Sequence, residues 1–114
     1  MPEIVKLVIS FLTLLTGFFS LFSPHSTVGF TGLKPEGGRG VTEIRAVLGG
    51  LFIALGLAPF IYRGDTFAML GLTYLGIAVV RLVSIFVDKS STQSNWISLA
   101  VEILFGAILM VGAW

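Results

Sequence analysis

Three ionisable side chains, Arg45, Arg81 and Glu102, lie inside stretches that are otherwise apolar. A charge left unpaired within a membrane costs at least a few kcal/mol, so we expect these groups to meet. The expected arrangement is an Arg81–Glu102 ion pair, with Arg45 as a second donor to Glu102. Such a cluster can lock helices together, or it can form a polar pocket that binds a ligand headgroup, an ion or a proton. The sequence leaves both readings open.

The depths of the three charges favour this pairing. Arg81 lies about six residues before the end of one apolar stretch and Glu102 about six residues after the start of the next, so each is about 9 Å below the same interface. The stretch that contains Arg45 begins on that side too, because the loop before it returns there. Three charges on three different helices are therefore expected in one leaflet.

Further polar residues are expected on the inner faces of the same helices or at the helix ends nearby. They are Glu43, Asp88, Ser84, Ser98 and Tyr74. On the last apolar stretch, Ser98, Glu102 and Gly106 are four residues apart and share one helix face. The small residues on either side of Glu102 leave a gap through which a partner side chain can reach its carboxylate.

The elements that must position these residues are four apolar stretches, over residues 4–22, 41–61, 66–87 and 95–113. A spanning helix needs about 20 mainly apolar residues. Charged residues make up only 11% of the chain, against about 25% in soluble domains. The sequence therefore predicts an all-α fold, a membrane-spanning four-helix antiparallel bundle that forms one transmembrane domain over residues 1–114. A long loop rich in proline and glycine is expected at residues 23–40.

Small residues predict where the helices pack closely. The second stretch carries a small residue at every fourth position, at Ala46, Gly50, Ala54 and Ala58. We expect this ridge to be a packing face, on a helix that Thr42 caps at its N-terminus. The first stretch has a similar stripe, at Ser10, Thr13, Gly17 and Ser20. That stripe is expected to face the other helices, with Phe11, Phe18 and Phe22 pointing away from it.

Aromatic residues predict the membrane interfaces. Trp96 and Trp114 are separated by about 27 Å of helix, which is close to the roughly 30 Å thickness of the hydrocarbon core. We expect them to be the two interface anchors of the fourth span, with Tyr62 as a further anchor at the end of the second span.

The net charge and the numbers of cysteine and histidine residues exclude several kinds of binding site. A net charge of +1 argues against binding of nucleic acid, which needs a clustered basic face. The chain has no cysteine and one histidine, so thiolate sites and multi-histidine metal sites are excluded. His25 alone, with no supporting motif, is a poor candidate for a haem or pigment ligand. No catalytic constellation is evident, and we expect neither an enzyme nor a cofactor, apart from bound lipid.

Three motifs resemble a known family. They are the Glu43-Ile-Arg45-Ala46-Val-Leu-Gly49-Gly50 segment, the Arg81-x-x-Ser84-x-x-x-Asp88 segment and Glu102. The chain resembles a bacterial four-helix membrane family described as domain of unknown function 4345, which is distantly similar to DoxX-like membrane proteins. The resemblance implies the four-helix bundle, a multi-pass location in the bacterial inner membrane, and a common role for Glu43, Arg45, Gly50, Arg81, Asp88 and Glu102. It implies no activity, and the DoxX-like relatives suggest a place beside respiratory or redox complexes.

Two functions remain after these exclusions. The first is an accessory or scaffolding subunit of a larger membrane complex, respiratory or photosynthetic, whose partners are other membrane subunits or copies of itself. The second is a small transporter, or a protein that binds lipid or solute through the intramembrane Arg/Glu pocket. A membrane-embedded enzyme ranks below both. Membrane lipids are expected partners in either case.

Overall fold

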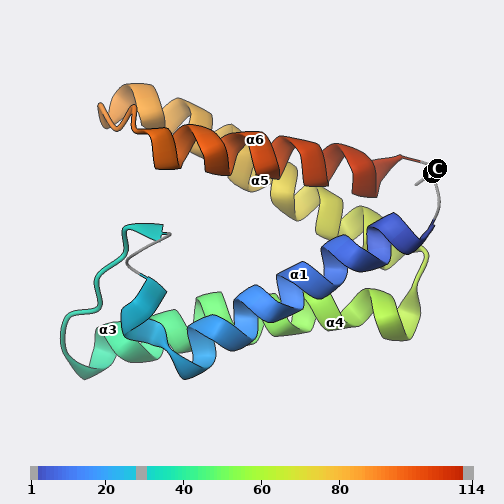
Figure 1. The fold of residues 1–114 in the computed structure, drawn as a ribbon, viewed down its shortest axis with the longest axis horizontal. Helices are drawn as coiled ribbons and strands as arrows, with labels where there is room; N and C mark the ends of the chain where they lie inside the picture. The colour runs from blue at the N-terminus through green and yellow to red at the C-terminus, as the bar shows by residue number, and fades with distance from the viewer. Residues whose placement is uncertain (1–2, 28–30, 112–114) are drawn as a thin grey trace. The chain divides into compact units, whose positions relative to one another are not determined.

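The computed structural model describes residues 3–27 and 31–111 and is all-α over that part of the chain. It contains four helical spans long and apolar enough to cross a membrane: Glu3–Phe22, Gly37–Tyr62, Asp65–Val87 and Gln93–Met110. Figure 1 shows these helices in chain order, from blue to red. The predicted fold class is confirmed, and the chain is a multi-pass integral membrane protein.

The chain divides into two compact units, each built around a pair of spans. The N-terminal unit comprises residues 7–61, and the C-terminal unit comprises residues 1–6 and 62–114. The long helix α1 (Glu3–Phe22) contributes to both units, because its first turn belongs to the C-terminal one. The single domain over residues 1–114 stays a prediction, and each unit is described by itself.

The stripe of small and hydroxylated residues on α1 is buried, as predicted. It consists of Ser10, Thr13, Gly17 and Ser20. The Thr13 hydroxyl donates to the carbonyl oxygen of Ile9 and the Ser20 hydroxyl to that of Thr16, each at 3.0 Å. Bonds of this kind satisfy a hydroxyl group on its own helix where no water is present. The phenylalanines Phe11, Phe18 and Phe22 are exposed, which also agrees with the prediction.

The second span begins earlier than predicted. It runs through α3 (Gly37–Glu43), the π-helix η2 (Ile44–Leu51) and α4 (Phe52–Tyr62). The predicted loop at 23–40 is correspondingly shorter, and Pro24–Thr27 forms the short 3₁₀ helix η1.

Residues at the start of α3 explain why a glycine-rich segment is helical. Gly37 takes a left-handed backbone conformation (φ 64°) and turns the chain into the helix, which glycine does at little cost. The Arg39 guanidinium and the Glu43 carboxylate then pair one turn apart, at 3.3 Å. The predicted cap is wrong, because Glu36 occupies the N-cap position and Thr42 lies inside the helix.

Within the N-terminal unit, the second span does not pack through the predicted ridge, whose role as a packing face stays a prediction. Ala46, Gly50 and Ala54 are exposed and Ala58 is only half-buried. The buried residues are instead Ile44, Gly49, Gly56 and Pro59. Residues 44–51 form a π-helix, whose i→i+5 hydrogen bonds widen each turn. Ile44 and Gly49, which an ideal α-helix would place far apart around its axis, therefore lie near one face.

Glycine is required on the face that packs against α1. A Cβ on Gly56 would lie 2.5 Å from the backbone nitrogen of Leu14, and a Cβ on Gly49 would lie 3.2 Å from the Cα of Leu21. From the other side, a Cβ on Gly17 would lie 2.6 Å from the backbone nitrogen of Ile53. The two helices of the N-terminal unit therefore approach backbone to backbone, as small residues allow in membrane proteins.

In the C-terminal unit, α5 (Asp65–Val87) and α6 (Gln93–Met110) lie side by side, joined by a short turn (Figure 1). Their contact contains the buried side chains Ala78, Ile85 and Leu99. α6 starts two residues before its predicted start. Thr92 caps it, because the Thr92 hydroxyl accepts from the backbone N–H of Asn95 at 3.2 Å, the usual function of an N-cap side chain.

The proposed interface anchors are placed as follows. Tyr62 is the exposed last residue of α4. Trp96 lies in the first turn of α6, where its Nε1 donates to the Ser91 hydroxyl at 2.8 Å and its ring packs edge-on against Phe86. Trp114 lies outside the described residues. The role of these residues as anchors stays a prediction.

Candidate functional site

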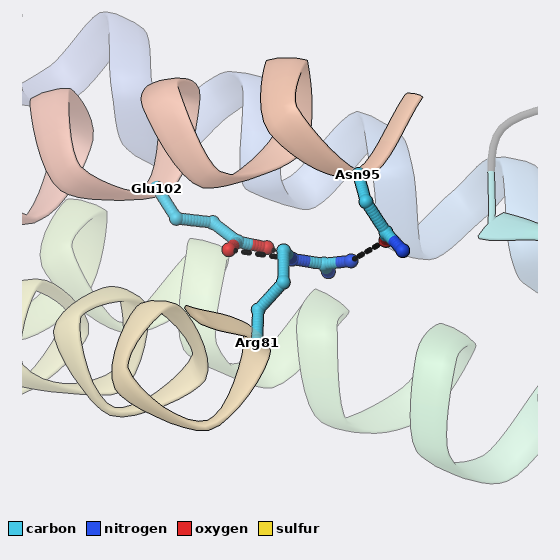
Figure 2. Close-up of polar contacts among 3 residues, drawn as sticks. All are labelled: Arg81, Asn95 and Glu102. Carbon is cyan, nitrogen blue, oxygen red and sulfur yellow. Dashed lines mark hydrogen bonds and ion pairs between the residues drawn. The ribbon is translucent and has the colours of Figure 1, made fainter. Parts of the chain in front are cut away.

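The side chains of Arg81 on α5 and Glu102 on α6 form a two-pronged ion pair (Figure 2). The Nε of Arg81 donates to Oε1 of Glu102 and its Nη2 donates to Oε2, each at 2.8 Å. The Glu102 side chain is 11% exposed and that of Arg81 is 30% exposed. Paired bonds between the planar guanidinium and a carboxylate are among the stronger polar contacts in proteins and fix the relative orientation of both groups.

Asn95 completes the cluster, and sequence reasoning did not identify it. The Nη1 of Arg81 donates to Oδ1 of Asn95 at 2.9 Å (Figure 2), and Nδ2 of Asn95 donates to the carbonyl oxygen of Ser90 at 2.9 Å. Asn95 thus connects the ion pair to the turn between the helices. The available signal was its spacing of seven residues from Glu102, which places both on one face of a helix.

Arg81 keeps hydrogen-bonding capacity after these contacts. Nη1 and Nη2 each carry two N–H bonds, and the structure gives each nitrogen one acceptor, Asn95 for Nη1 and Glu102 for Nη2. The second N–H of each nitrogen has no acceptor among the described residues. Since Arg81 lines an open cleft, those N–H groups are candidate donors to a ligand.

An open cleft of about 630 Å³ adjoins the cluster. Its apolar end lies near the middle of α5, and its polar end lies at the turn between α5 and α6. It is lined by Gly76, Ile77, Val80, Arg81, Ser84, Asp88, Ser90 and Asn95. The cleft thus brings three of the predicted polar residues, Arg81, Ser84 and Asp88, to one surface.

Other predicted members of the cluster have different partners or positions. Tyr74 packs edge-on against the ring of Phe105, with centroids 5.5 Å apart, and Ser98 is half-buried on α6. In the N-terminal unit, Glu43 pairs with Arg39.

Arg45 also belongs to the N-terminal unit, where its Nε donates to the carbonyl oxygen of Leu21 at 3.1 Å. This contact places a positive charge at the C-terminal end of α1, where the helix dipole favours one. Donation from Arg45 to Glu102 stays a prediction.

A metal-binding group is absent from the described part of the chain. Within residues 3–27 and 31–111, no cluster of three or more His, Asp or Glu side chains could hold a metal ion. His25 is exposed in η1.

The contribution of Asn95 can be measured by mutation. We expect Asn95→Ala to lower the free energy of unfolding by about 1–2 kcal/mol, because it removes an acceptor for Arg81 and a donor to Ser90. SDS-driven unfolding of the protein in mixed micelles, followed by circular dichroism, measures this loss. Ser94→Ala is the control, because Ser94 is exposed and its hydroxyl takes no part in the hydrogen bonds of the cluster. Equal stability of the two variants would contradict the assigned role.

Comparison with known proteins gives a match to a protein family. Residues 2–113 match the model of the family described as "Domain of unknown function (DUF4345)". Neither the curated proteins nor the solved structures contain a match to the chain.

Proposed function

Because the chain belongs to the family of domain of unknown function 4345, whose description names no activity, we propose its function from its own geometry. The proposal is an accessory or scaffolding subunit of a larger membrane complex, of the respiratory or photosynthetic kind, in the bacterial inner membrane. Its partners are other membrane subunits or further copies of the chain.

The observation that carries this proposal is the exposed row of small residues on the second span. In the N-terminal unit, α1 packs against the face of Gly49 and Gly56 and leaves Ala46, Gly50 and Ala54 exposed. A Cβ on Gly50 would meet only the carbonyl oxygen of Arg45, at 4.0 Å. In a membrane, a row of small residues lets a further helix approach closely. The row therefore suits a docked helix from another subunit.

Cross-linking in native membranes tests the proposal, and the absence of cysteine permits single-cysteine variants. Ala54→Cys carrying a short photoreactive cross-linker should give adducts of higher mass. Val79→Cys, at an exposed position on α5, should give several-fold fewer. Adding Gly50→Leu to Ala54→Cys should abolish the adducts without loss of helicity, because the leucine obstructs the row. Recovery of only the monomer from Ala54→Cys would contradict a scaffolding role.

A second function is favoured by a different observation. The cleft beside Arg81 has an apolar end and a polar end and is open at the surface of the C-terminal unit. This supports a protein that binds or transports a lipid or small solute through the Arg81–Glu102 pocket. The two proposals differ in what accompanies the purified chain, larger subunits for the first and a bound lipid or solute for the second.

A further inference from the structure

We propose that the cleft of the C-terminal unit binds a glycerophospholipid whose headgroup carries a phosphate and a primary ammonium. Arg81 binds the phosphate and Asp88 binds the ammonium. The inference rests on the second proposed function, lipid or solute binding, and names the ligand class for that site.

The cleft changes from apolar to polar along its length. Gly76, Ile77 and Val80 form its apolar part, and Asp88 and Ser90 lie at its other end, in the turn that follows α5. At a rise of about 1.5 Å per residue, the distance along α5 from Gly76 to Asp88 is about 18 Å. A lipid has the same order of groups, with acyl chains deep in the membrane and a polar headgroup at the helix ends. A small polar solute would gain nothing from the apolar part.

Arg81 is fixed in orientation but retains N–H groups for a ligand. Glu102 and Asn95 hold its guanidinium in place, while one N–H on each terminal nitrogen remains without an acceptor among the described residues. A phosphate accepts such N–H groups well. Since Glu102 already balances the charge of Arg81, the guanidinium supplies oriented donors with little net positive charge. An anionic headgroup without a cation is therefore poorly matched.

Asp88 lies at the polar end of the cleft. Its carboxylate is exposed and has no hydrogen-bond or ion-pair partner within the described residues. Asp88 is the C-cap residue of α5, where the helix dipole also favours a positive charge. Arg81, Glu102 and Asp88 sum to a charge of −1. A primary ammonium meets this charge and donates hydrogen bonds to the carboxylate, which a trimethylammonium group cannot do.

Native mass spectrometry on the full chain tests the inference. The chain is placed in phosphatidylcholine nanodiscs that contain equal minor amounts of phosphatidylethanolamine and phosphatidylglycerol. We expect the wild type to retain phosphatidylethanolamine in preference to both other lipids. Asp88→Asn should lower that preference about tenfold, the loss expected for a hydrogen bond between charged groups. Soluble phosphoethanolamine at equal concentration should not displace the lipid, because it lacks acyl chains.

Two variants serve as controls. Asp65→Asn removes an exposed acid at the opposite end of the same helix and should leave the preference unchanged. Asp88→Glu keeps the charge and should retain most of the preference.

Each opposite result overturns a stated part of the proposal. Retention of phosphatidylglycerol instead would overturn the inference and leave lipid binding intact. If Asp88→Asn prefers phosphatidylethanolamine as strongly as the wild type does, Asp88 does not bind the ammonium. Retention of none of the three lipids would overturn the inference together with the lipid-binding form of the second proposed function, and would leave only its solute-binding form.

Discussion

Replacing Glu102 with glutamine is expected to lower the free energy of unfolding by about 2–3 kcal/mol. Glutamine keeps an oxygen near Arg81 but removes the charge that balances the guanidinium, and an unbalanced charge in apolar surroundings is costly. The expected loss lies below that for a fully buried pair because the Arg81 side chain is 30% exposed. SDS-driven unfolding in mixed micelles, with helicity as the signal, measures the difference. Glu43→Gln is the control, because the Arg39–Glu43 pair is exposed and such pairs contribute at most about 1 kcal/mol.

The double variant Glu102→Gln with Arg81→Gln should recover part of this loss, because no uncompensated charge remains. A coupling energy of about 1 kcal/mol or more between the two substitutions would establish the pair as an energetic unit. Purely additive effects would contradict it.

The same double variant separates the two readings of the cluster. If the ion pair only locks α5 to α6, the folded double variant should retain the lipid preference of the wild type. If Arg81 binds a ligand, the double variant should fold and lose that preference.

Gly56→Ala is expected to destabilise the N-terminal unit by about 2–3 kcal/mol. The added Cβ would lie 2.5 Å from the backbone nitrogen of Leu14 and 2.7 Å from the carbonyl oxygen of Ser10. Both atoms belong to the backbone of α1, so no side chain can move aside and the helices must separate, with a loss typical of overpacking. Thermal unfolding in detergent, monitored by circular dichroism, should show a lower midpoint.

Gly50→Ala is the matched control for this experiment, on the same span. A Cβ there meets nothing closer than 4.0 Å, so we expect a change within about 0.5 kcal/mol. A larger loss from Gly50→Ala than from Gly56→Ala would restore the ridge of Ala46, Gly50 and Ala54 as the packing face within the chain.

The four spans could be predicted because their signal is local. Length and apolar composition decide whether a segment can cross a membrane, and neither depends on what the segment packs against. The stripe on α1 was predictable for a similar reason, since that helix is regular from Glu3 to Phe22 and spacings of three and four then define a face. The contact between Arg81 and Glu102 could be predicted because only a short turn joins α5 to α6. That turn places both residues at a similar depth on neighbouring helices.

The packing face of the second span was decided by the tertiary structure. Residue spacing identifies a face only when the helix type is known, and the π-helix over Ile44–Leu51 changes the residues that align. The close approach to α1 at Gly49 and Gly56 depends on how the two helices cross, which the sequence of one helix does not show.

The role of Asn95 and the first residue of α3 could likewise not be predicted from the sequence. The contact of Asn95 depends on how the Arg81 side chain extends toward the turn between α5 and α6. The start of α3 depends on a left-handed glycine and an ion pair that offset a composition unfavourable to helix. The segments that can cross the membrane could be predicted without the structure, because hydropathy acts on each segment separately. The meeting of Arg81 with Glu102 could be predicted as well, because both residues lie at a similar depth on consecutive helices. The helix faces that meet and the N–H groups that remain for a ligand depend on atoms from two helices, so they became known only from the structure.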